Sequence, residues 1–163
     1  MARRGAWPLW FVLGVLALLH FYLRPRVYTG QGAPDFLLLA LLILSIRSRP
    51  GTAAVAGFVV GLVADVLSPA RFGAGMLAHT LVAYVAAWGR AVFFADNLLV
   101  NAGVFFLGTW MRNFLVLLLS GFAAEAAFAS VTLWSTLQAL STALAGVLVV
   151  LAIRHRVDFR LEE

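Results

Sequence analysis

Four polar side chains interrupt long apolar runs of the sequence and are the residues best placed to do chemistry: Asp65, His79, Arg112 and Gln138. Counting helix rise from the expected membrane edges puts Asp65 and Arg112 at one depth, about 21 Å from the cytoplasmic edge. Gln138 lies about 22 Å up, and His79 lies about 10 Å below the outer edge. Because a charge facing lipid costs several kcal/mol, we expect these groups to converge inside a helical bundle. The sequence predicts an Asp65–Arg112 ion pair extended by His79 and Gln138.

Three roles are open for this polar cluster: an internal ion pair that fixes helix packing, a ligand pocket open to the outside, and a proton relay. Catalysis has little support, because the sequence contains no Gly-x-Ser-x-Gly, no glycine-rich phosphate loop and no histidine spacing typical of a metal site. Cysteine is absent, which excludes disulfides and thiolate ligands. We therefore expect a protein without enzymatic activity, cofactor or metal.

The elements that position these residues follow from composition. The chain has 163 residues, of which 63% are hydrophobic and 12% charged, whereas soluble domains have roughly 25% charged residues. We predict a single domain over residues 1–163, an all-α integral membrane protein with six transmembrane helices. The expected helices cover about residues 7–23, 30–46, 51–67, 72–88, 98–122 and 128–153. The second apolar run, 35–46, is short, and it spans a bilayer only by borrowing from residues 28–34 or by local thinning.

The formal net charge is +5, and all 12 basic residues are arginines. Eleven of them flank the apolar runs, and the twelfth, Arg112, lies inside the fifth run. This spacing is typical of orientation signals at membrane boundaries and argues against a nucleic-acid-binding stripe. With six spans, eight arginines lie in the cytoplasm and three outside: Arg3, Arg4, Arg47, Arg49, Arg90, Arg154, Arg156 and Arg160 against Arg24, Arg26 and Arg71. A five-span alternative with a re-entrant second run gives the same tally. Arg3 and Arg4 favour six spans, with both termini in the cytoplasm.

A stripe of small residues, Ala53, Gly57 and Gly61, ends in Asp65 at intervals of four along the third expected helix. Small residues let another helix approach closely. The stripe is either a packing face within the chain or a binding face for another membrane protein. Asp35, directly after Pro34, is interpreted as part of the first turn of the second helix, where a carboxylate meets the helix dipole. We assign no chemistry to Asp35 or to His20, which is expected near the outer interface.

Residues 34–42 (PDFLLLALL), residues 57–65 (GFVVGLVAD) and the pair Phe72-Gly73 resemble the bacterial rod shape-determining protein family MreD. The resemblance covers about residues 34–88. Its motif residues are Pro34, Asp35, Gly57, Gly61, Asp65 and Gly73. It implies a non-enzymatic inner membrane protein that binds MreC and works with MreB, RodA and a class B penicillin-binding protein in the elongasome, which directs peptidoglycan synthesis.

The MreD family is similar in fold to the S components of energy-coupling factor transporters. This similarity supplies an alternative function, the substrate-binding subunit of a vitamin or small-molecule transporter. The first expected helix, residues 7–23, lacks the Ala-x-x-x-Ala pattern by which S components commonly dock on their coupling subunit. The resemblance therefore favours the scaffold. Beyond these proteins, the only partner we expect is membrane lipid.

Overall fold

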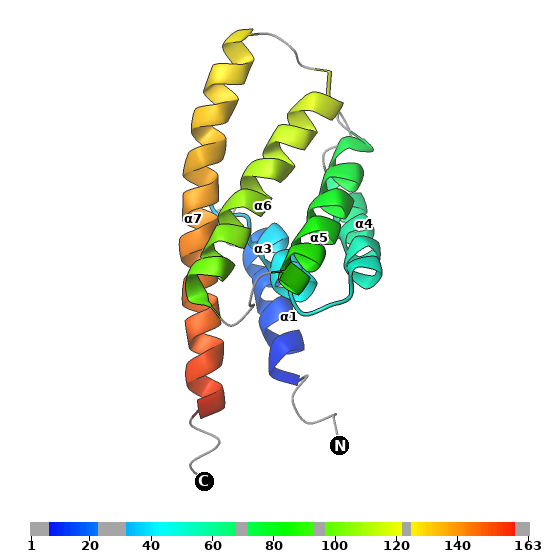
Figure 1. Cartoon of the computed structure of the whole chain (residues 1–163). Coiled ribbons are helices and arrows are strands. Elements are labelled where there is room, and N and C mark those ends of the chain that lie inside the picture. Colours follow the sequence, from blue (N-terminus) through cyan, green and yellow to red (C-terminus); the bar gives the residue numbers. More distant parts are fainter. Residues whose placement is uncertain (1–6, 23–31, 68–71, 93–96, 122–124, 159–163) are drawn as a thin grey trace.

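The computed structural model describes residues 7–22, 32–67, 72–92, 97–121 and 125–158, and within these ranges it is built from six helices (Figure 1). They are α1 (Trp7–Tyr22), α3 (Phe36–Ser45), α4 (Pro50–Val66), α5 (Ala74–Val92), α6 (Leu98–Leu119) and α7 (Glu125–Asp158). Successive helices run in alternating directions, so that α1 begins and α7 ends at the same end of the bundle. The predicted fold class, an all-α bundle of six helices, is confirmed.

Apolar side chains cover much of the outer surface of the bundle. Leu99 is 81% exposed, and Leu144 and Leu148 are each 67% exposed. Two segments, Leu98–Leu119 and Thr132–Ile153, are long and apolar enough to cross a membrane, and the other helices contain shorter apolar segments. Apolar exposure on this scale is unfavourable in water but suits a bilayer. The surface is that of a membrane protein.

Helix α3 lies at the centre of the bundle and is too short to span a bilayer. It has ten residues, which rise about 15 Å, against about 30 Å for the apolar core of a membrane. It contacts α1, α4, α5, α6 and α7, and residues 38–43 are all buried. Residues 38–43 are all apolar because every side of α3 is buried.

The helix predicted over residues 30–46 is wrong at its start, because residues 32–35 are not helical. Pro34 disfavours helical geometry in the residue before it. Asp35 then caps α3, since its Oδ1 accepts a hydrogen bond from the Leu38 N–H at 3.0 Å. Residues 28–31 lie outside the described ranges, as do Arg3, Arg4, Arg24, Arg26 and Arg71. Helix α7 extends beyond the predicted 128–153 at both ends.

The small-residue stripe packs α4 against α5. The buried residues of α4 are Ala53, Gly57, Gly61 and Asp65, which are the stripe and its terminal carboxylate. A Cβ at Gly57 would lie 2.5 Å from the carbonyl oxygen of His79, and one at Gly61 would lie 2.6 Å from the Cα of Met76. Both distances are too short for any side chain. Of the two alternatives for the stripe, the structure supports packing within the chain.

Candidate functional site

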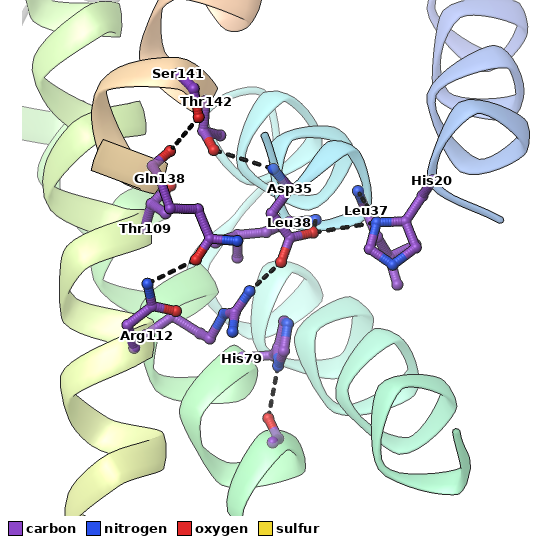
Figure 2. Close-up of polar contacts among 12 residues, drawn as sticks. His20, Asp35, Leu37, Leu38, His79, Thr109, Arg112, Gln138, Ser141 and Thr142 are labelled. Carbon is purple, nitrogen blue, oxygen red and sulfur yellow. Dashed lines mark hydrogen bonds and ion pairs between the residues drawn. The ribbon is translucent and has the colours of Figure 1, made fainter. Parts of the chain in front are cut away.

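A buried ion pair between Asp35 and Arg112 lies at the start of α3 (Figure 2). The Arg112 Nη2 of α6 donates to Asp35 Oδ2, and Asp35 is only 3% exposed. The Asp35 backbone N–H donates to Thr142 Oγ1 of α7 at 3.1 Å. A single N-cap residue thereby joins α3 to α6 and α7. The pair also places a countercharge beside a carboxylate that would otherwise be buried alone.

Helix α1 reaches the same point through His20. The His20 Nδ1 lies 3.2 Å from the backbone nitrogen of Leu37, which donates to it, and 3.3 Å from Asp35 Oδ1. The Leu37 N–H is one of the first-turn donors of α3 that have no partner within their own helix. His20 therefore supplies a cap to α3 from a neighbouring helix.

Two further hydrogen bonds hold α7 beside this site. The Asn113 Nδ2 of α6 donates to Gln138 Oε1 at 2.8 Å. The Ser141 hydroxyl donates to the carbonyl oxygen of Gly32 at 2.8 Å, which fixes the segment that leads into α3. Residues 32–35 are consequently held on α7 by both Ser141 and Thr142.

Asp65 forms a second polar centre, at the junction of α4 and α5. Its carboxylate accepts three backbone N–H groups, from Gly73 at 2.8 Å, Gly75 at 3.0 Å and Met76 at 2.9 Å. These donors belong to the start of α5 and the residue before it, so Asp65 of one helix caps the next. Gly73 has φ +96°, and a Cβ on Gly75 would overlap Asp65 Oδ1. The Asp65 and Gly73 elements of the sequence motif thus form one helix-capping device.

The predicted ion pair between Asp65 and Arg112 is wrong. Helix rise gives the height of a side chain but not the direction in which it points around the helix. Asp65 is satisfied by backbone donors of α5, whereas Arg112 points toward α3 and pairs with Asp35. The depth estimate did not include Asp35, which is buried.

The four residues singled out from the sequence all line the interior. Asp65, His79 and Gln138 are buried, and the Arg112 side chain is 17% exposed. His79 Nδ1 is hydrogen-bonded to the carbonyl oxygen of Gly75 at 2.7 Å. His79 also lies within electrostatic reach of Arg112, Asp35 and Asp65.

Sequence reasoning did not place His20, Asn113 or Thr142 in the site, and it assigned Asp35 no partner. One feature of the sequence, the short second apolar run, could have indicated that Asp35 is buried and paired. A run too short to span must start inside the bundle, so its N-cap carboxylate is buried and requires a countercharge. Among the described residues, no three of the His, Asp and Glu side chains are grouped so as to hold a metal ion. The arrangement fixes helices and neutralises charge.

Comparison with known proteins gives one family. The sequence model of the rod shape-determining protein MreD matches residues 1–155, which extends the resemblance from the motif region to nearly the whole chain. No curated protein and no solved structure matches the chain significantly.

Proposed function

Because the chain belongs to the MreD family of rod shape-determining proteins, we propose that it is a non-enzymatic scaffold of the bacterial inner membrane that binds MreC. Family membership implies a role in rod shape determination. In this proposal the chain and MreC act together with MreB, RodA and a class B penicillin-binding protein, which join them directly or through MreC. The complex supports peptidoglycan synthesis during cell elongation.

One observation carries the choice of a scaffold over a transporter subunit. The charged side chains in the interior of the described bundle join helices: Asp35 and Arg112 join α3 to α6, and Asp65 joins α4 to α5. A site for a small polar ligand needs polar groups that converge on the ligand rather than on one another. Because these interior groups bind one another, they support a rigid bundle whose partners bind its outer surface.

The positions of two arginines support an orientation of the chain in the membrane. Arg47 and Arg49 lie between α3 and α4, at the end of the bundle where α1 begins and α7 ends (Figure 1). Arginine in short connections marks the cytoplasmic side. In the proposed orientation both termini are therefore cytoplasmic, and the connection between α6 and α7 lies outside.

The test is copurification. The full chain, tagged at its carboxyl end, is purified in a mild detergent from cells that also produce MreC and, at matched level, an unrelated protein with one transmembrane helix. Recovery of MreC without the control protein supports the scaffold. Recovery of an ATPase module with its membrane coupling subunit supports the transporter alternative. Absence of MreC from a folded, monodisperse preparation contradicts the proposed partnership.

A further inference from the structure

We propose that the bundle holds the bilayer thin along one side, beside α4. The proposal starts from the lengths of the helices that face lipid. Helix α4 has 17 residues and rises about 25 Å, whereas the apolar segment Thr132–Ile153 of α7 has 22 residues and rises about 33 Å. The apolar core of a bilayer is about 30 Å thick, so α7 spans it and α4 is about 5 Å too short.

Helix α4 is exposed over most of its circumference. Its buried residues are the small-residue stripe and Asp65. Large apolar side chains occupy the outward positions, where Val55, Val59 and Val66 are 65%, 53% and 61% exposed. In a membrane these side chains contact lipid, so the lipid beside α4 has to match the length of α4 itself.

Polar groups fix both ends of α4. Arg47 and Arg49 precede the helix, and both side chains are exposed. At the other end, Asp65 accepts the N–H groups of Gly75 and Met76, which joins the end of α4 to the start of α5. The sequence that follows α4, residues 68–71, is Ser-Pro-Ala-Arg. The apolar length of α4 is therefore set by these ends.

Tilting does not correct the mismatch. A helix that is too long fits a bilayer by tilting, but tilt makes the projection of a short helix on the membrane normal shorter still. Sliding along α5 is also prevented, because a Cβ at Gly57 would lie only 2.5 Å from the carbonyl oxygen of His79 and the two backbones are thus in close contact. The bilayer has to adapt, and its hydrocarbon layer becomes thinner beside α4.

The effect is confined to one side of the bundle. Helix α4 contacts α3 and α5, whereas α7 contacts α3 and α6, and the two helices lie at opposite sides (Figure 1). Exposed leucines extend along α7 from Leu133 to Leu151, a rise of about 27 Å. The membrane is therefore thicker beside α7 than beside α4, and lipids with shorter chains are favoured beside α4. This inference requires insertion into a membrane but is independent of the proposed binding of MreC.

The experiment measures local thickness with single spin labels, since the natural chain has no cysteine. Thr52→Cys and Leu67→Cys place a nitroxide near either end of α4, and Leu133→Cys and Leu151→Cys do the same on α7, all at exposed positions. Electron paramagnetic resonance gives the depth of each nitroxide from its collision rates with oxygen and with a water-soluble nickel complex. The full chain is studied at one copy per nanodisc. The structure gives the separation of the two sites on each helix, and adding the two depths gives the local thickness.

We expect the hydrocarbon layer of dioleoyl phosphatidylcholine to be about 5 Å thinner beside α4 than beside α7. The difference should increase in dierucoyl phosphatidylcholine, which has longer chains, and decrease in dimyristoleoyl phosphatidylcholine, which has shorter chains. Labels at the middle of each helix, Val59→Cys and Leu144→Cys, are the controls. Both should be accessible to oxygen and protected from nickel in every lipid.

Two outcomes overturn the proposal. One is equal thickness beside α4 and α7 in dierucoyl phosphatidylcholine while the chain remains folded and monodisperse, since the bilayer would then ignore the length of α4. The other is a Val59→Cys label that is protected from oxygen as well as from nickel, since α4 would then be covered by protein and not by lipid.

Discussion

Arg112 of α6 pairs with Asp35, the N-cap residue of α3, across 77 positions of the sequence. The pair places a fixed positive charge beside a carboxylate at the buried start of a helix. Buried pairs of this kind contribute little net stability, because desolvation offsets the attraction, but they are costly to break. The Asp35–Arg112 pair therefore specifies where the short helix begins within the bundle.

Removing one member of this pair should be more harmful than removing both. Asp35→Asn or Arg112→Leu alone leaves an uncompensated group inside the bundle, at a cost of ~3–5 kcal/mol in the free energy of unfolding. The double variant should lose much less than the sum of the single losses. Denaturant unfolding in detergent measures all three variants, with Arg49→Gln as an exposed control. Simple additivity would contradict the pairing.

Asp65 and Arg112 should behave as independent residues. Asp65→Ala removes the acceptor for three N–H groups at the start of α5, so we expect a loss of about 2 kcal/mol or more. Combined with Arg112→Leu, the two losses should add to within about 0.5 kcal/mol, because the residues share no direct contact. The same unfolding assay tests this. If the double variant loses clearly less stability than the sum of the two single losses, the result would support the Asp65–Arg112 ion pair predicted from helix depth.

Leucine at the buried glycines of α4 should prevent α4 and α5 from packing. Gly57→Leu and Gly61→Leu place a branched side chain where the backbone of α5 already lies. We expect aggregation or loss of the protein from the membrane fraction, measured by size-exclusion chromatography and immunoblotting. Gly14→Leu is the matched control, since a Cβ at Gly14 meets nothing within 4 Å, and it should remain monodisperse. A folded Gly57→Leu variant would show that the stripe is not internal.

Thr142→Val should destabilise the bundle through one hydrogen bond. The substitution keeps the shape of the side chain but leaves the buried Asp35 N–H without its acceptor, which costs about 1–3 kcal/mol. Thr80→Val is the control, because Thr80 donates to the carbonyl oxygen of Met76 in its own helix. Equal shifts in melting temperature for the two variants would show that the Asp35–Thr142 bond has no special importance.

Single cysteines should report the proposed orientation, because the natural chain has none. Ser48→Cys lies between α3 and α4, and Ser120→Cys lies at the C-cap of α6, at the opposite end of the bundle (Figure 1). A maleimide that cannot cross membranes should label Ser120→Cys in spheroplasts and should label Ser48→Cys only after lysis. Ala2→Cys should behave like Ser48→Cys. Labelling of Ala2→Cys in spheroplasts would favour an amino terminus outside.

The sequence predicted six helices from its six apolar runs, and the described residues contain all six. It failed at the start of α3, where Pro34 and the cap formed by Asp35 exclude the residues that the helix was expected to borrow. Helix rise is likewise insufficient to pair charges, because the phase of each helix depends on contacts with all its neighbours. The rotation of α6 about its own axis turns Arg112 toward α3. The rotation of α4 turns Asp65 toward the backbone N–H groups of α5.

Residues of the site that escaped prediction have a common property. A single threonine, asparagine or histidine in an apolar run, such as Thr142, Asn113 or His20, gives no sign of its partner until tertiary structure brings two helices together. The stripe of Gly57 and Gly61 was visible in the sequence because its spacing lies within one helix. The identity of the helix that it contacts required the structure.

The position of Asp35 has a consequence for biosynthesis. Asp35 emerges from the ribosome 77 residues before Arg112, its countercharge, and directly before α3. Helix α3 is too short to be inserted as a transmembrane segment by its own hydrophobicity. Thr142, which receives the Asp35 N–H, is made later still. The amino-terminal half of the chain therefore cannot reach its final arrangement during its own synthesis. Helix α3 is the second helix to be synthesised, but its contacts with α6 and α7 form only after those last two helices have been made.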